Sequence, residues 1–227
     1  MILSRNDLIN KLSHELEKYS PIVIVGEVDT GKTFFLKKLC ENLVNNSVVN
    51  EYTIHQSRDV LDRMVQAIST KDMANWKQSF LASEVIIIED FDYFIGRQTT
   101  QEELLSIFKI AKCPIIISAT LPINNGDFCD GLAQFFSAGT YIKLCYPSHE
   151  DITLRLKSLI EDNTIYLSNE AYEWLLIQDI QSFTKVKGIV KTLSLYSRDE
   201  ENKIGLDECK NIIKPYLVMQ CKEVYVE

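Results

Sequence analysis

The sequence lacks the features of a membrane or secreted protein. No apolar run reaches the roughly 18 residues that a membrane-spanning helix needs. The amino-terminal residues, MILSRND, do not lead from a basic segment into an apolar stretch, so a secretory signal is not expected. No internal repeat or low-complexity segment occurs. With 46% hydrophobic and 25% charged residues, the chain has the composition of a soluble globular protein.

Cysteine and basic residues are arranged in ways that argue against two kinds of site. The six cysteines form no C-x-x-C pair and have no histidine at ligand spacing, so neither a zinc site nor a disulfide framework is expected. We therefore expect a reduced, cytoplasmic protein.

The net charge is −8, and only Lys185, Lys187 and Lys191 cluster, which we interpret as a solvated helix face. Direct DNA binding is not expected, because it relies on clustered Lys and Arg.

The sequence does contain a phosphate-binding loop. An apolar strand at residues 22–25 runs into G-x-x-x-x-G-K-T, which opens a helix. Gly26 lets the chain turn tightly and Gly31 lets the backbone approach a phosphate, toward which amides of the loop and helix point. Lys32 would reach the β- and γ-phosphates and the Thr33 hydroxyl would ligate Mg²⁺. The predicted site for ATP or ADP comprises Gly26, Glu27, Val28, Asp29, Thr30, Gly31, Lys32, Thr33 and Phe34.

A second strand ends in two acidic residues. Residues 85–88 are a short run of Val and Ile, typical of a strand that is buried on both faces. Glu89 and Asp90 follow it, at the edge of the sheet where ligands bind in open α/β folds. We assign Glu89 to the magnesium shell and Asp90 to orienting or deprotonating the attacking water.

The order of predicted elements indicates two domains. Strands are expected at 22–25, 51–55, 85–88, 114–118 and 141–144, and helices at 7–19, 31–45, 57–68, 73–82 and 101–111. Strands separated by helices give a parallel sheet covered on both faces. Helices alone follow, at 150–162, 168–178, 182–197 and 206–217. We predict an α/β nucleotide-binding domain at 1–147 and a small helical domain at 148–227.

Three segments resemble the DnaA/Hda-type AAA+ family. Residues 89–108, EDFDYFIGRQTTQEELLSIF, are similar to the Walker B region of that family. Residues 115–122, IIISATLP, resemble its sensor 1 strand, and residues 147–217 resemble its helical lid. The resemblance covers about residues 20–217. It implies a P-loop AAA+ sheet flanked by helices, followed by an all-helical lid. It further implies a stand-alone, Hda-like regulator of DnaA-dependent chromosomal replication initiation.

Key positions depart from the family pattern. The sensor 1 Asp is Thr120, which we place among the catalytic residues because its hydroxyl can still hydrogen-bond a phosphate or water. Phe135 stands where the arginine finger is expected and cannot replace it. Arg97, in the loop after the Walker B region, is the nearest other candidate, with an ordinary surface residue as the alternative interpretation. The sensor 2 Arg maps to Thr184, with Lys185 beside it. Since a finger is worth ~10³–10⁵ in rate, we expect weak or absent intrinsic ATPase activity.

Two other functions stay open. One is an active ATPase of the helicase-loader type, like DnaC or IstB, and the other is an interaction module with a relict nucleotide site. The resemblance implies DnaA as partner, with the sliding clamp as a second. No clamp-binding Q-L-x-L-P-L peptide is evident in residues 1–7, where Ile2 and Leu3 could be its vestige. We expect a monomer or a nucleotide-dependent oligomer.

Overall fold

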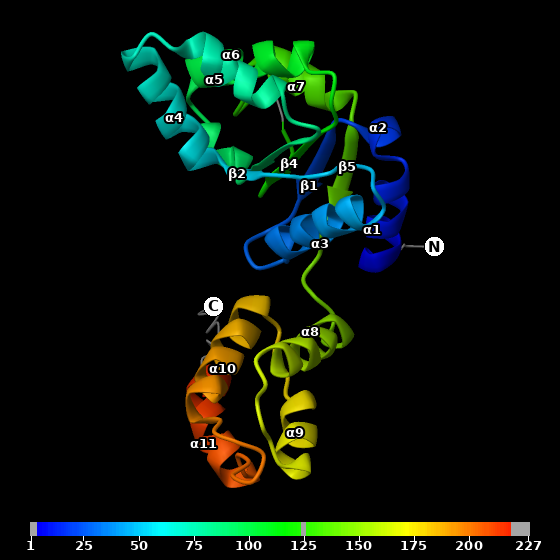
Figure 1. Cartoon of the computed structure of the whole chain (residues 1–227), viewed down its shortest axis with the longest axis vertical. Coiled ribbons are helices and arrows are strands. Elements are labelled where there is room, and N and C mark those ends of the chain that lie inside the picture. The colour runs from blue at the N-terminus through cyan, green and yellow to red at the C-terminus, as the bar shows by residue number, and fades with distance from the viewer. Residues whose placement is uncertain (1–3, 124–125, 219–227) are drawn as a thin grey trace, which may run out of the picture. The chain divides into compact units, whose positions relative to one another are not determined.

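The first unit of the protein is built on a parallel sheet. The computed structural model describes residues 4–123 and 126–218 and divides into two compact units, Met1–Cys145 and Tyr146–Glu227. All pairings in the sheet are parallel, and its strand order is β2-β3-β4-β1-β5. The strands are β1 (Ile22–Val25), β2 (Ile54–Gln56), β3 (Ile86–Glu89), β4 (Ile115–Ala119) and β5 (Thr140–Lys143). The prediction of a parallel α/β sheet flanked by helices is confirmed (Figure 1).

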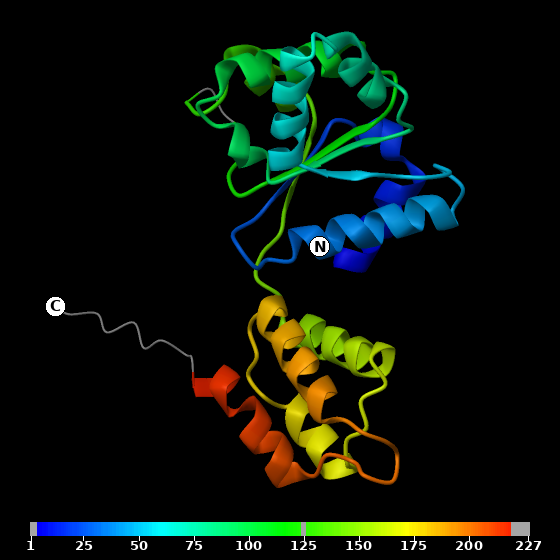
Figure 2. The same cartoon turned by 60° about the vertical axis from the view of Figure 1, so that its left-hand side comes forward.

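Helices cover both faces of this sheet (Figure 2). One face carries α1 (Arg5–His14), α2 (Leu16–Tyr19) and α3 (Lys32–Asn45). The other carries α4 (Ser57–Ser69), α5 (Met73–Leu81), the 3₁₀ turn η1 (Phe91–Phe94), α6 (Gln98–Ile110) and α7 (Asp130–Ser137). The strands supply both layers because successive side chains point to opposite faces. In β1, for example, Ile22 and Ile24 pack toward α3, whereas Val23 and Val25 pack toward α4–α7.

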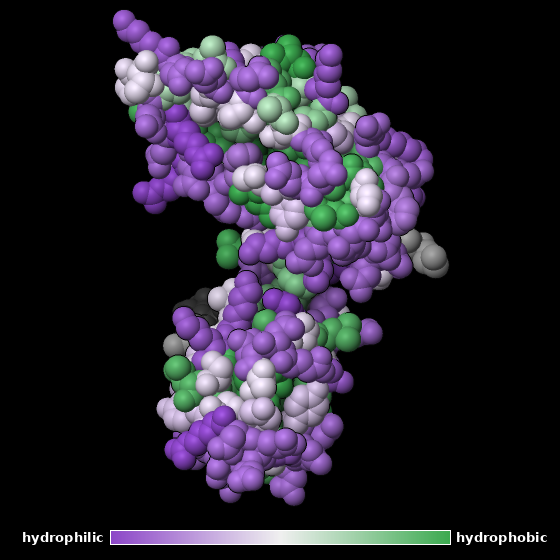
Figure 3. Space-filling model, in the orientation of Figure 1, coloured by the Kyte–Doolittle hydropathy of each residue, from purple (hydrophilic) through white to green (hydrophobic). Residues whose placement is uncertain are grey.

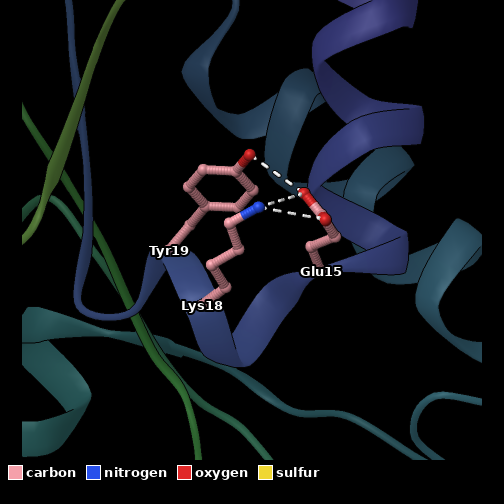
Figure 4. Close-up of polar contacts among 3 residues, drawn as sticks. All are labelled: Glu15, Lys18 and Tyr19. Atoms are coloured by element: carbon pink, nitrogen blue, oxygen red, sulfur yellow. Dashed lines mark hydrogen bonds and ion pairs between the residues drawn. The ribbon is translucent and has the colours of Figure 1, made fainter.

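The amino-terminal helix differs from its prediction. The expected single helix over 7–19 is two helices, α1 and α2, which break at Glu15. Ser4 caps α1 and forms a capping box with Asp7. After the break, the Glu15 carboxylate accepts hydrogen bonds from Lys18 Nζ at 3.1 Å and Tyr19 OH at 3.0 Å (Figure 4). These bonds lower the pKa of Glu15, the Lys18 bond most.

Other strand and helix boundaries differ from their predictions, and two of these differences lie at the site. The strand expected at 51–55 lies at Ile54–Gln56, and β3 extends one residue further than expected, to Glu89. The helix expected at 101–111 begins at Gln98, and η1 and α7 were not expected. With these boundaries, Gln56 and Glu89 are the last residues of the neighbouring strands β2 and β3, and Gln56 pairs in register with Glu89.

The second unit is helical over its described residues. Its elements are α8 (His149–Asp162), α9 (Asn169–Leu176), α10 (Phe183–Tyr196) and α11 (Leu206–Val218), with an isolated parallel bridge between Leu167 and Ile204. A separate apolar core holds these helices together, with Leu156, Leu175 and Val186 among its buried members.

Two cysteines contribute to the cores. Burial raises the pKa of the Cys40 thiol to about 12 and that of Cys209 to about 11, so both pack as small apolar side chains. Cys145, by contrast, is exposed. Hydrophilic side chains dominate the surface of the first unit seen in Figure 3. Over residues 4–123 and 126–218, no helix has the length and apolar character to cross a membrane. Ile2 and Leu3 lie outside the described residues.

Gly139, directly before β5, provides a stability test. A Cβ there would lie 2.2 Å from the Pro21 carbonyl oxygen, which already accepts the Thr140 amide at 2.8 Å. We expect Gly139→Ala to lower the free energy of unfolding by about 1–3 kcal/mol, because backbone must move. Gly131→Ala is the control, since its Cβ would meet only the flexible end of Leu105. Urea unfolding followed by circular dichroism makes the comparison, and equal midpoints for both variants would refute this account of the fold.

Candidate nucleotide-binding site

The predicted site residues of the first unit gather at the carboxyl edge of the sheet. Because all five strands run parallel, their carboxyl ends meet at one edge. The loop Gly26–Gly31 leaves β1, Glu89 ends β3 and Thr120 follows β4. The Gly26 amide donates to the Ala119 carbonyl at 3.2 Å, which fixes the start of the loop against the end of β4.

The two glycines of the loop are required for different reasons. A Cβ on Gly26 would lie 2.5 Å from Thr30 Oγ1 and 2.8 Å from the Leu144 carbonyl oxygen, so close packing excludes any side chain there. Gly31 caps α3 with φ of 86°, in the left-handed region that favours glycine. Asp29 also has a positive φ, 68°, as Asp tolerates. Glu27 and Val28 are exposed at the outside of the loop.

Lys32 is folded back on the loop. Its ammonium donates to the carbonyl oxygens of Gly26 at 2.6 Å and Glu27 at 3.0 Å, and the residue is buried. The cation is thereby held at the loop where a phosphate would need it. Thr33, next on the first turn of α3, is exposed and Phe34 is half-buried.

Glu89 is a buried carboxylate that is only half satisfied. The residue is 2% exposed. Its Oε2 accepts a hydrogen bond from Gln56 Nε2, and its backbone carbonyl accepts one from Ser57 Oγ at 2.7 Å. Its Oε1 is buried and has no hydrogen-bond partner among the described residues. A buried polar atom left in this way costs free energy unless a ligand or ion satisfies it.

The Oε1 of Glu89, unpartnered among the residues described, is a ligand that Mg²⁺ could use at this site. Mg²⁺ is commonly held by one or two carboxylates, waters and the phosphates of a nucleotide. Glu89 supplies such a carboxylate at the sheet edge and Thr33 supplies an exposed hydroxyl beside Lys32. Over the described part of the chain, no cluster of three or more His, Cys, Asp or Glu could hold a metal alone. The residues therefore fit a metal that arrives with a nucleotide, rather than a metal site built by protein alone.

Asp90 turns the chain away from the strand. Its φ of 55° is in the left-handed region, its carbonyl accepts the Tyr93 amide at 2.9 Å, and its own amide donates to Ser118 Oγ at 3.2 Å. Asp90 is exposed, unlike Glu89 beside it. The two acids predicted together thus have different environments, one buried and one open to water.

Asp92 was missed by the sequence reasoning. Its carboxylate accepts the backbone amide of Thr120 at 2.5 Å and that of Leu121 at 3.4 Å, so it holds the loop after β4. Thr120 is half-buried at this point. Gln56, Ser57 and Ser118 were missed too. The sequence signal that could have identified these three residues is a polar side chain within or beside an apolar strand.

Phe135, at the expected finger position, and Arg97, the candidate for that role, both pack on aromatic rings. Phe135 is half-buried, stacks on Phe108 with centroids 5.8 Å apart, and meets Phe136 edge-on at 5.3 Å. Arg97 folds onto Tyr93, with its guanidinium 4.5 Å from the ring centroid and Nη1 donating to the Tyr93 carbonyl at 2.6 Å.

Thr184 and Lys185 lie in the first turn of α10, in the second unit. Ser182 caps this helix by accepting the Lys185 amide at 3.1 Å. Thr184 is exposed and Lys185 half-buried. Their part in nucleotide binding stays a prediction.

Comparisons with known proteins identify this architecture. The family described as "Bacterial DnaA ATPAse domain" matches residues 7–143. The chromosomal replication initiator protein DnaA of Geotalea uraniireducens is 22% identical over 219 residues, which are 95% of this chain and 49% of that protein. The chain thus spans about half the length of this relative.

Solved structures show the same fold. Domain III of the replication initiation protein DnaA from Thermotoga maritima has a TM-score of 0.79 at 20% identity, over 92% of this chain and 90% of that chain. A replication initiator DnaA bound to AMPPCP and single-stranded DNA has a TM-score of 0.67 at 20% identity, over 86% of this chain and 62% of that chain. The predicted AAA+ fold is confirmed.

The role of Asp92 can be measured directly. Asp92→Ala leaves the amides of Thr120 and Leu121 without this acceptor, so we expect the free energy of unfolding to fall by about 1–3 kcal/mol. Asp62→Ala removes an exposed carboxylate from α4 and serves as the control, with an expected change within about 0.5 kcal/mol. If urea unfolding gives the two variants the same stability, the Asp92 carboxylate does not hold this loop.

Proposed function

Since the family match covers residues 7–143, the chain belongs to the bacterial DnaA ATPase-domain family, and we propose that it is a nucleotide-binding regulator of DnaA-dependent replication initiation, in the manner of Hda. The proposed ligand is ATP or ADP with Mg²⁺. The proposed partner is DnaA, and the sliding clamp is a second candidate.

This proposal rests on the arrangement of the phosphate-binding loop and its lysine. Lys32 is buried against the carbonyls of Gly26 and Glu27, and the loop leads directly into α3. Amides at the start of a helix and a nearby ammonium together favour a phosphate group. Because the loop and its lysine are already arranged, little ordering is needed when a nucleotide binds.

Each predicted residue has a role in this proposal. Mg²⁺ would be held by Glu89 and Thr33 and would neutralise phosphate charge. Asp90, which is exposed, would orient or deprotonate a water, and Thr120 would hydrogen-bond the γ-phosphate or that water. Thr184 or Lys185, at the position that resembles sensor 2, would contact the nucleotide.

We propose that intrinsic hydrolysis is weak or absent. An arginine finger contributes roughly 10³–10⁵ in rate, and Phe135, at the matching position, stacks on Phe108. Thr120 carries no charge, and Arg97 lies on Tyr93. The selection of residues supports binding and not turnover. A helicase loader, the competing function, would need both a finger and a surface for DNA.

Lys32→Ala tests nucleotide binding. We expect wild-type protein to gain about 4 kcal/mol of stability with ADP and Mg²⁺ at a thousandfold excess over Kd. Lys32→Ala should lose that gain, because the ammonium near the phosphates is gone. Thermal unfolding and calorimetry with ADP and ATP measure the effect.

Lys37→Ala is the matched control, as it removes an exposed lysine from the same helix. It should keep the full nucleotide-dependent shift. Wild-type protein that melts identically with and without nucleotide would refute the proposed site. In the same preparations, association with purified DnaA should depend on nucleotide and be lost with Lys32→Ala.

Steady-state ATP hydrolysis separates the regulator from the loader. We expect slow turnover that single-stranded DNA does not change, because the chain offers no free finger among the residues assigned to that role. Glu89→Gln provides the background rate. Robust turnover that single-stranded DNA stimulates would instead place the protein with helicase loaders.

A further inference from the structure

Arg5 joins the phosphate-binding loop to the segment that follows β5. It lies in the first turn of α1, the helix that packs beside α3 (Figure 1). Its Nη1 donates to the Thr30 carbonyl at 2.8 Å and its Nη2 to the Cys145 carbonyl at 2.7 Å. The two acceptors are 115 residues apart, since Cys145 follows Thr30 by that number (145 less 30), and a single side chain connects them.

The local sequence does not explain an arginine at this position. A cation in the first turn of a helix opposes the helix dipole, and the amino terminus of α1 is already capped by Ser4 and Asp7. A residue that is unfavourable for its own helix points to a role in tertiary structure. Here that role is the pair of carbonyl contacts.

The segments that Arg5 connects are also in direct contact. The Leu144 amide donates to the Val25 carbonyl at 2.7 Å, which continues the β1–β5 pairing to the start of the loop. Gly26 leaves no room for a Cβ between Thr30 Oγ1 and the Leu144 carbonyl. Thr30 is 2% exposed and its Oγ1 donates to the Glu27 carbonyl at 2.9 Å. Movement of Thr30 would therefore disturb its hydrogen bond with Arg5 and its close packing with Gly26 and Leu144.

We propose that Arg5 is a positioning residue that couples occupancy of the phosphate-binding loop to the order of residues 144–146, from which the chain continues into the second unit. This inference rests on the proposed nucleotide binding. Nucleotide that orders the loop fixes the Thr30 carbonyl, and Arg5 then holds the Cys145 carbonyl. Because coupling between two equilibria is reciprocal, loosening residues 144–146 must weaken nucleotide binding by the same factor.

The guanidinium fork is essential to this role. Arg presents several N–H donors in a rigid plane, whereas Lys presents one compact ammonium on a flexible stem. Arg5→Lys retains the charge but cannot reach both carbonyls with the same fixed geometry. A purely electrostatic role predicts full rescue by Lys, and the positioning role predicts partial rescue.

The experiment uses the full chain in four forms: wild type, Arg5→Ala, Arg5→Lys and Lys11→Ala. Lys11→Ala removes an exposed cation from the same helix and is the control. Calorimetry with ADP and Mg²⁺ measures Kd. Hydrogen exchange with and without ADP measures protection of the amides of residues 144–146.

We expect Arg5→Ala to raise Kd about tenfold, equivalent to about 1.4 kcal/mol, and to abolish the ADP-dependent protection at 144–146. Arg5→Lys should fall between Arg5→Ala and wild type, and Lys11→Ala should match wild type. Loss of thermal stability alone, with Kd and protection unchanged, would overturn the inference and leave Arg5 a structural residue.

Two further outcomes are distinguishable. If wild type binds no ADP, the proposed function fails and the inference fails with it. If wild type binds ADP but Arg5→Ala does not fold, as judged by circular dichroism, Arg5→Lys decides. Wild-type affinity and protection in that variant would overturn the inference, and a partial loss of both would support it.

Discussion

The close approach of three chain segments at Gly26 is the constraint on which the site depends. The end of β1, the end of β4 and the residues after β5 meet there, through the Gly26 amide on the Ala119 carbonyl and the Leu144 amide on the Val25 carbonyl. A Cβ would collide with Thr30 and Leu144. Without this contact the loop could not sit directly over the sheet edge, and Lys32 would lose the carbonyls that hold it.

The buried Glu89 carboxylate, at the same edge of the sheet, lowers stability unless a ligand or ion satisfies it. Glu89 is 2% exposed with one carboxylate oxygen unpaired among the described residues. An apolar residue would suit this position better if folding alone mattered. Gln56 and Ser57 hold Glu89 from β2 and α4, so its orientation is set before any ligand arrives. Functional sites commonly carry such a cost.

The sequence predicts whatever depends on local pattern. Apolar runs give β1, β3 and β4 within a residue or two, and the G-x-x-x-x-G-K-T spacing locates the loop. What depends on contacts between distant residues was not predictable. Asp92 meets Thr120 28 residues away, and Arg5 meets Cys145 140 residues away. The hydrophobic periodicity of the sequence does not indicate such pairs. The break at Glu15, whose backbone has φ of −130° and ψ of 35°, is not apparent from the apolar stripe, which continues across it.

The aromatic layer around Phe135 would make a single substitution to arginine at this position costly. Phe91, Phe108 and Phe136 contact one another at centroid distances of 5.6–6.3 Å, and Phe135 extends this layer by stacking on Phe108. An arginine at 135 would remove apolar area from Phe108 and also need a path to water for its charge. Its guanidinium could stack on the same ring, which would keep it in α7 rather than extended. An arginine at this position would therefore require repacking of Phe108 as well.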